Sequence, residues 1–338
     1  MKKLVIVESP TKQRTIVRYL GKGFSIASSL GHIRDLSKSG LYNLGVDVEH
    51  DFEPDYMVLP GKQKVVANLL KQVEKADEVY LATDPDREGE AISWHLAKVL
   101  GLDIEKVQRL EFHEITPYGI QNAIQNPRPL NVNLVESQET RRILDRIIGF
   151  RLSALLRDKI QSQSAGRVQS AVLKLIVDKE NEIKAFVPKD YFVIDAIVHE
   201  KKQPFSLRLV KVKDQEITIN SQEEADQIIQ TLGKELEVVE VSTQEKEFYP
   251  RPPFTTSSLQ QEAFYRLKFS TNKTMKIAQN LFEGVHLKDC QQGIITYIRT
   301  DSIRVNPAFI NLAKKEIESL YGPEYIGKAY VQKQKDNL

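Results

Sequence analysis

The sequence predicts an α/β domain at the N-terminus, followed by mixed α and α+β segments. Over roughly the first 125 residues, short apolar runs alternate with helical patterns, which indicates a parallel sheet covered on both faces. From residue 131 to about 185 the apolar positions repeat with helical periodicity, and residues 191–220 are typical of strands. With 338 residues, the chain is also too long for one ordinary compact domain, so we expect several.

The elements of the α/β part follow from its apolar runs. Residues 4–7 (LVIV) form a strand that ends at Glu8, and Pro10 and Thr11 precede a helical pattern with Ile16, Val17 and Leu20 on one face. Further strands are expected at roughly 24–29, 55–59 and 79–83, helices at 62–75 and 88–100, and an exposed loop at 37–54, which is rich in Gly, Ser, Asn and Asp.

The remaining elements are read in the same way. Ser164 is the expected cap of a second long helix within 131–185. Ser221 and Glu224 have capping-box spacing and open a helix to about residue 232. We expect strands in 191–220, with a turn at 201–204, and at 236–241 and 293–298, and helices at 256–267, 273–283 and 307–319.

Composition excludes several classes of protein. Hydrophobic residues make up 41% and charged residues 28%, which is the balance of a globular protein rather than a disordered one. The single cysteine, Cys290, excludes an internal disulfide framework and a cysteine-cluster zinc site. No apolar run approaches the roughly 18 residues that span a bilayer, and the apolar run at the start is too short for a signal peptide. We therefore expect a cytoplasmic protein.

Charge is unevenly distributed along the chain. Lys and Arg number 48 against 46 Asp and Glu, so the formal net charge is only +2. Residues 141–174 nevertheless hold eight basic residues against two acidic ones, a local charge of +6. Arg142 and Asp145 are neighbours on one helix face, and Arg167 lies near a helix N-terminus. This region is expected to bind a phosphate backbone; the alternative is an ordinary charged helix surface.

Three carboxylates alternate directly after a predicted buried strand, namely Asp84, Asp86 and Glu88. Such a group at the carboxyl end of a parallel strand can converge on Mg²⁺, which prefers oxygen ligands. The alternative is helix capping, with Asp86 as the cap and Glu88 favouring the helix dipole.

Three further sets of residues are candidates for chemistry. Glu8 could protonate a leaving group and Lys12 could hold a phosphate, or both could be solvated. Tyr297 and Arg299 would point the same way in a strand, and the arginine would lower the phenol pKa for attack on a phosphodiester; the alternative is a core tyrosine with a capping arginine. His32 could donate to a phosphate or be an ordinary loop histidine.

Read together, these segments resemble type IA DNA topoisomerases, and bacterial topoisomerase I more than topoisomerase III, because Ile298 stands where the latter typically has proline. Seven blocks carry the resemblance in order along nearly the whole chain: VESPTK (7–12), GHIRDL (31–36), DPDREGEAISWHL (84–96), RRILDRIIGF (141–150), SAGRVQS (164–170), PFTTSSLQQEA (253–263) and GIITYIRTDS (293–302).

The resemblance implies a fold and a division into domains. We expect a Toprim α/β domain at 1–128, a helical gate-domain segment at 129–188, a β-rich hinge-domain segment at 189–252 and the helical domain of the catalytic tyrosine at 253–338. The family's block with an active-site histidine, and the return halves of hinge and gate, should follow residue 338. The type IA core is therefore expected to be incomplete at its C-terminus and impaired in relaxing supercoils.

The resemblance also implies an activity. Tyr297 would attack a single-strand phosphodiester and become linked to the 5′ phosphate, with Glu8 protonating the departing 3′ oxygen, and Arg299 and Lys12 stabilising the phosphate. Asp84, Asp86 and Glu88 would hold Mg²⁺. Residues near the bound strand would be His32, Arg142, Asp145, Arg167, Gln279 and Thr300.

Strand passage and religation would need no ATP, the substrate would be single-stranded and negatively supercoiled DNA, and the complete protein would be monomeric. Two other classes remain open: another Toprim enzyme, such as a primase or nuclease, or a non-catalytic DNA-binding fragment.

Overall fold

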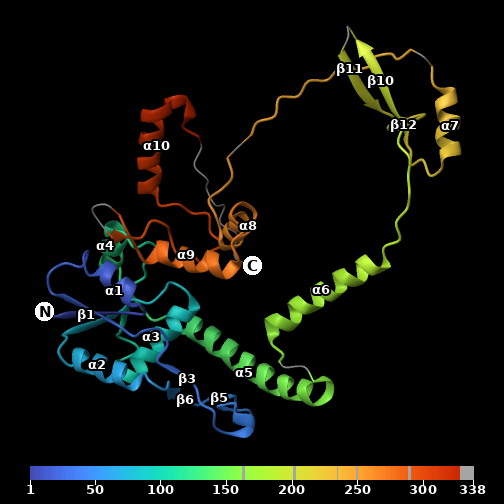
Figure 1. Ribbon diagram of the computed structural model, residues 1–338. Coiled ribbons are helices and arrows are strands. Elements are labelled where there is room, and N and C mark those ends of the chain that lie inside the picture. Colours follow the sequence, from blue (N-terminus) through green and yellow to red (C-terminus); the bar gives the residue numbers. More distant parts are fainter. Residues whose placement is uncertain (162–163, 201–202, 234, 249, 288–290, 328–338) are drawn as a thin grey trace. The chain divides into compact units, whose positions relative to one another are not determined.

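The computed structural model describes residues 1–161, 164–200, 203–233, 235–248, 250–287 and 291–327 (Figure 1). The chain forms two compact units, one of Met1–Arg167 with Pro250–Leu338 and one of Val168–Tyr249. The first unit therefore joins the predicted Toprim domain to the predicted tyrosine domain. The division into four segments stays a prediction.

A five-stranded sheet lies at the centre of the first unit, and its predicted parallel character is confirmed. Its order is β2 (Phe24–Ser28), β1 (Lys3–Val7), β7 (Glu78–Leu81), β8 (Gln108–Arg109) and β9 (Arg128–Pro129). All neighbouring pairs are parallel except β8 and β9. The carboxyl ends of β1 and β7 consequently meet at one edge, where Glu8 and Asp84 follow.

Helices cover both faces of this sheet, as the alternation of elements predicts. Val5 and Val7 of β1 belong to a core formed with α1 (Pro10–Ile16), α4 (Pro117–Gln125) and α9 (Thr271–Glu283). Leu4 and Ile6 point to the other core, formed with α2 (Gln63–Val73) and α3 (Arg87–Leu100). Figure 1 shows α9 beside α1, so a helix from the last quarter of the chain covers the N-terminal sheet.

The expectation of an exposed loop at 37–54 is wrong in part. The segment contains η1 (Leu41–Asn43) and the paired strands β4 (Val46–Asp47) and β5 (Glu53–Pro54). Leu44 and Val46 are buried in a small core together with Ile143 and Ile147 of α5 (Val132–Ile160). These apolar residues are spaced too irregularly to predict an element, but tertiary packing buries them.

The strand before that segment, β3 (Arg34–Leu36), pairs antiparallel with β6 (Tyr56–Val58). The two long helices are confirmed as α5 and α6 (Arg167–Ala185). Ser164 is not the cap of α6, which starts three residues later. The segment before α6 is instead tied to α5, since Ser153 Oγ accepts from the Ala165 amide at 2.9 Å.

The second unit contains the predicted strands and helix. β10 (Asp195–Glu200) and β11 (Gln203–Arg208) form a hairpin, followed by the pair β12 (Lys211–Val212) and β13 (Gln215–Glu216) and by α7 (Gln222–Thr231), capped by Ser221. Within the predicted turn, residues 201–202 lie outside the described residues. The strand expected at 236–241 is wrong: the segment has no regular structure and Val239 is 91% exposed. A strand needs a neighbour to satisfy its backbone groups, and this sequence pattern alone supplies none.

The C-terminal part of the first unit is mainly helical. It contains α8 (Thr256–Leu267), α9, the short pair β14 (Val285–His286) and β15 (Gln291–Gln292), α10 (Pro307–Tyr321) and η2 (Pro323–Tyr325). The buried strand expected at 293–298 is wrong. The chain runs there without a ladder, held by single bonds from the amides of Gly293 and Tyr297 to the carbonyls of Ile115 and His113, both at 2.9 Å.

Candidate active site

The first candidate residues lie where β1 ends and α1 begins. Ser9 caps α1 by accepting from the Lys12 amide at 3.1 Å, which places the Lys12 side chain back over the end of the sheet. Lys12 is only 2% exposed, and its ammonium lies 2.5 Å from Glu8 and also donates to Asp84 of the neighbouring strand end. The two candidates Glu8 and Lys12 thus pair with each other, and Lys12 also contacts a carboxylate that is 72 residues away in sequence.

The turn after β7 positions Asp84 and Asp86. Asp86 is the N-cap of α3, because its Oδ1 accepts from the Gly89 amide at 2.8 Å, as the capping alternative anticipates. A side chain at Gly89 would bring its Cβ within 2.0 Å of the Asp84 carbonyl oxygen, so only glycine permits this close turn.

Tyr297 and Arg299 both meet Asp86, which confirms that they point the same way although no strand carries them. The Tyr297 hydroxyl donates to Asp86 Oδ2 at 2.6 Å, and Arg299 Nη1 donates to the same oxygen at 3.1 Å. The Phe282 ring packs edge-on against Tyr297 at 5.3 Å between centroids. We call the residues gathered here the catalytic cluster: Glu8, Lys12, Asp84, Asp86, Tyr297 and Arg299.

The pKa values in the catalytic cluster are shifted in opposite directions. Burial raises the pKa of the Asp84 carboxyl to about 7; Lys12 opposes this rise and the adjacent Glu8 adds to it. Burial also acts to raise the pKa of Glu8, but Lys12 and a hydrogen bond with Asp84 hold that pKa below its usual value. The two carboxyls therefore share about one proton near neutral pH.

Arg299 lowers the pKa of the Tyr297 phenol as expected, but other effects outweigh it. Burial raises the pKa of Tyr297 well above its usual value, and Asp84 and Asp86 raise it further, while Arg299 opposes them with a smaller effect. Tyr297 is accordingly a neutral phenol whose proton already points at the Asp86 carboxylate.

A buried ion-pair network beneath the turn went undetected in the sequence. Arg109 is fully buried and donates to the carbonyls of Leu81, Thr83 and Asp84 at 3.0, 3.3 and 3.1 Å, and to Glu90 at 3.1 Å. Arg128 also donates to Glu90 at 2.6 Å. No local signal in the sequence indicates it, because Arg109 lies among other polar and charged residues, such as Gln108 and Glu111.

Glu88 does not join the other two carboxylates of its motif. Its Oε2 lies 3.6 Å from His32 and accepts from Gln138 at 3.3 Å, on the other side of the turn. Among the described residues, no three His, Cys, Asp or Glu side chains are arranged as a metal site. Glu8, Asp84 and Asp86 are nevertheless hard oxygen donors, and the pKa of Asp84 is raised chiefly by burial and further by Glu8, so a cation would stabilise its charged form. This donor set fits Mg²⁺.

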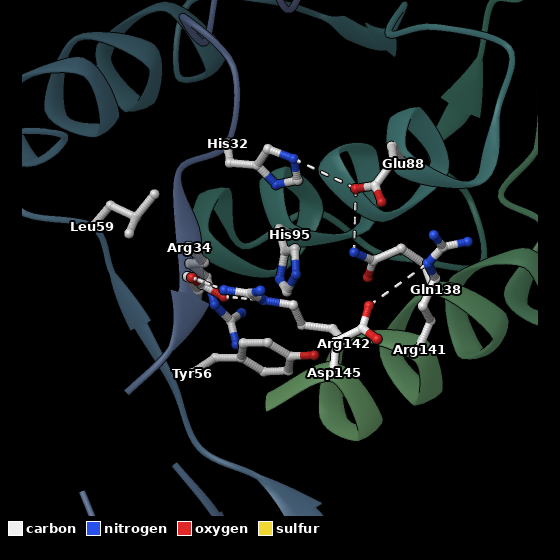
Figure 2. Close-up of a pocket in the computed structure, with 11 residues that line it drawn as sticks. His32, Arg34, Tyr56, Leu59, Glu88, His95, Gln138, Arg141, Arg142 and Asp145 are labelled. Carbon is white, nitrogen blue, oxygen red and sulfur yellow. Dashed lines mark hydrogen bonds and ion pairs between the residues drawn. The ribbon is translucent and has the colours of Figure 1, made fainter. Parts of the chain in front are cut away.

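Beside the catalytic cluster lies a pocket of about 360 Å³ between β3, β6, α3 and α5, which we call the α5 pocket (Figure 2). His32, Arg142 and Asp145 line it, and Arg167 reaches Asp145 at 2.9 Å, so four predicted DNA-binding residues come together. Arg142 and Asp145 do not pair with each other. Arg142 pairs with Asp35 instead, and Asp145 with Arg167 and Arg141.

The other lining residues make the α5 pocket neutral overall. Three arginines (Arg34, Arg141, Arg142) face three carboxylates (Asp35, Glu88, Asp145). Figure 2 shows the His95 ring between these groups; its Nδ1 is buried and has no partner among the described residues. Burial, with Arg34 and His32, lowers the pKa of His95 to about 3, so its ring is neutral.

The last two predicted residues, Gln279 and Thr300, bond to neighbours of the catalytic cluster. Gln279 donates to Glu283 at 2.8 Å, and the same Glu283 oxygen accepts from Ser9 at 3.0 Å, beside Glu8. Thr300 donates its amide to Thr256 Oγ1 at 2.8 Å, which fastens the segment after Tyr297 to α8.

Comparisons with known proteins show the family to which the chain belongs. The DNA topoisomerase family profile matches residues 129–337 and the Toprim domain profile matches residues 3–115. DNA topoisomerase 1 of Campylobacter jejuni is 46% identical over 328 residues, which cover 96% of this chain and 46% of that protein. The structure of full-length topoisomerase I from Thermotoga maritima matches with a TM-score of 0.84 and 45% identity, over 96% of this chain and 54% of the other. The chain thus spans about half the length of these relatives.

Proposed function

This chain belongs to the bacterial type IA DNA topoisomerases, and we propose that its catalytic cluster cleaves one DNA strand through a 5′-phosphotyrosine intermediate. The observation that carries the proposal is the hydrogen bond from Tyr297 to Asp86, 211 residues apart in sequence, beside the Glu8–Lys12–Asp84 group. A nuclease or primase would have no use for a tyrosine held in this way.

The residues can divide the reaction between them. The Tyr297 oxygen attacks phosphorus while its proton passes to Asp86 Oδ2, the atom to which it already donates. The bond from phosphorus to the 3′ oxygen breaks, and that oxygen takes the proton shared by Glu8 and Asp84. Lys12 and Arg299 neutralise the charge that develops on the phosphate. Religation reverses these transfers, so no ATP is needed.

We propose Mg²⁺ as the cofactor, held by Asp84 and Asp86 with Glu8 beside them. The resemblance implies Glu88 as the third ligand, but Glu88 contacts His32 and Gln138 instead. When bound, the ion would neutralise phosphate charge. Replacing Asp84 and Asp86 with Ala should weaken Mg²⁺ binding at least tenfold in calorimetry, since charged oxygen ligands are lost. The control is Asp77→Ala, a carboxylate near the other end of the sheet. Equal binding by both variants would leave Asp86 as a helix cap alone.

The proposed partner is single-stranded DNA, bound along His32, Arg142, Asp145 and Arg167 with Gln279 and Thr300 near the phosphate. In the longer relatives' context, cleavage, strand passage and religation would relax negatively supercoiled DNA. We propose a cytoplasmic monomer. Among the described residues, none of the helices combines the length and apolar character that crossing a bilayer requires.

A denaturing gel with a single-stranded oligonucleotide tests cleavage without requiring strand passage. DNA labelled at its 3′ end should remain covalently attached to the protein, whereas a 5′ label should leave in a free product. Tyr297→Phe should abolish the adduct because only the hydroxyl is lost, and Tyr118→Phe, an exposed tyrosine, should not. Free cleaved ends without an adduct would favour a nuclease, and retention without cleavage a binding fragment.

A further inference from the structure

Asp35 joins the GHIRDL segment of β3 to the helix that lines the α5 pocket. Arg142 Nε donates to Asp35 Oδ1 at 2.8 Å, and Arg142 Nη2 donates to Oδ2, so the guanidinium is held by two parallel bonds. Arg146, one helical turn further along α5, lies 3.7 Å from the same Oδ2. A single carboxylate thus lies against two arginines on one face of α5.

Arg142 and Arg146 differ in the hydrogen-bond donors that they keep for another partner. Arg146 is buried, and it donates to the carbonyls of Ser37 and Leu36, both at 3.2 Å. Its pKa is lowered, first by burial and then by the charge of Arg142, which shows that the two guanidinium groups repel each other. Arg146 is therefore committed to holding β3 against α5.

Arg142 keeps a free edge. Its side chain is 40% exposed, and within the described part of the chain it donates only through Nε and Nη2. Nη1 is left for another acceptor. The two bonds to Asp35 restrict a long side chain that otherwise samples many rotamers, and a donor fixed before binding loses less freedom when a phosphate arrives.

We infer that Asp35 is a positioning residue for strand binding, which holds Arg142 so that its free edge faces a phosphate of the bound single strand. The inference rests on the proposed function, because it presupposes that Arg142 contacts DNA. Nothing in the resemblance assigns Asp35 a role. It acts through Arg142 and touches no reacting atom.

The opposite effect of removing Asp35 on DNA affinity is also physically possible, so a measurement can decide between the two. Asp35 carries a negative charge beside the proposed phosphate site, so its removal would strengthen attraction to DNA if charge alone mattered. Orientation should outweigh this effect, because the repulsion between Arg142 and Arg146 would be left without its intervening carboxylate and Arg142 would turn away.

The measurement is the Kd for a fluorescent single-stranded oligonucleotide, by anisotropy at constant salt. Asp35→Asn should raise the Kd roughly three- to tenfold, in the range of coupling between contacting residues. The rate of adduct formation at saturating DNA should stay the same, since the catalytic cluster is untouched. Asp35→Glu, which keeps the charge, should restore much of the affinity.

The matched control is Asp195→Asn in the second unit. Asp195 holds Arg208 by the same two-bond geometry, at 2.9 and 3.1 Å, but is not one of the proposed site residues. The Kd of the Asp195→Asn variant for the oligonucleotide should therefore not change. The specific readout is a double-mutant cycle. In an Arg142→Gln background, Asp35→Asn should cost little further affinity, whereas a merely structural role would cost the same in both backgrounds.

Several outcomes would overturn the inference. A lower or unchanged Kd in Asp35→Asn would show that the carboxylate competes with DNA or does nothing, and an equal loss in the Arg142→Gln background would make it structural. If the wild-type chain binds single strands but shows one of these results, only the inference fails. A wild-type chain that neither binds nor forms an adduct would remove the proposed function as well.

Discussion

The catalytic cluster and the α5 pocket lie on opposite sides of one turn and hold their charges differently. In the catalytic cluster, the nearly fully buried Lys12 serves two carboxylates that are themselves largely buried. At the α5 pocket, two half-exposed arginines pair with carboxylates, Arg142 with Asp35 and Arg167 with Asp145.

The two arrangements differ in what they can exchange, a proton in the catalytic cluster and an anionic partner in the α5 pocket. Two carboxyls that share one buried ammonium cannot both ionise freely, so the catalytic cluster keeps a proton available near neutral pH. A half-exposed arginine paired with a carboxylate can exchange or add an anionic partner at little cost, because water screens the pair. The catalytic cluster is therefore suited to moving protons, and the α5 pocket to binding a strand that must later leave.

The largest effect should come from removing the shared ammonium. Lys12→Met should reduce the rate of adduct formation about 100-fold or more, in line with losing one preorganised donor at a reacting phosphate. The Kd for single strands should change little, since the α5 pocket is intact. Lys3→Met is the control, because Lys3 lies at the start of β1 and pairs with Glu78, and it should leave the rate unchanged. A large loss of affinity in Lys12→Met would contradict the separation of the two regions.

The two regions should also respond oppositely to pH. The folded chain keeps a proton on Asp84 up to its raised pKa of about 7, whereas the unfolded carboxyl loses it near its ordinary pKa of 3.8. The folded state therefore binds more protons within this window, and the free energy of unfolding falls as pH rises through it, by up to about 1.4 kcal/mol per pH unit. In metal-free buffer, Asp84→Asn should remove this contribution, so its unfolding free energy in thermal or urea denaturation should rise with pH relative to that of the wild type between pH 5 and 7.

His95 in the α5 pocket serves as the comparison, with the sign reversed. Its folded pKa of about 3 lies below the ordinary histidine pKa of 6.5, so the unfolded chain binds the extra proton and stability rises with pH from about 3 to 6.5. His95→Gln should remove that rise, so its unfolding free energy falls more steeply with pH than that of the wild type. Parallel profiles for both variants would show that neither group titrates as the structure implies.

The sequence predicts the sheet and the helices that cover it well, because their signals are local. Leu4, Val5, Ile6 and Val7 form a continuous apolar run, which is typical of a strand buried on both faces, and in the structure they alternate between two cores. The segments that failed depend on distant partners. Residues 293–298 contain the pattern of a buried strand, but their amides bond singly to the separate carbonyls of Ile115, Leu281 and His113.

The candidate site shows the same limit. Local motifs with the family resemblance indicate Tyr297, Glu8 and Asp84, and the structure brings them together. What could not be predicted is how charges are shared across the chain: that Asp86 serves both α3 and Tyr297, or that Glu88 turns toward His32. The contacts of Asp35 with α5 and of Arg109 with the turn are likewise long-range, and spacing contains no information on them.

The smallest expected effect is on the salt dependence of single-strand binding, and it tests the α5 pocket most directly. Each phosphate contact releases counterions, so the logarithm of affinity for single strands should fall linearly with the logarithm of salt concentration, by about 0.7 per contact. Replacing Arg142 and Arg167 with Gln should reduce that slope by about 1.4 if each makes one contact. Arg208→Gln, in the second unit, is the control for loss of a paired arginine. An unchanged slope in the double variant would mean that Asp35 and Asp145 keep these arginines from the strand, and that the +6 region is only a solvated surface.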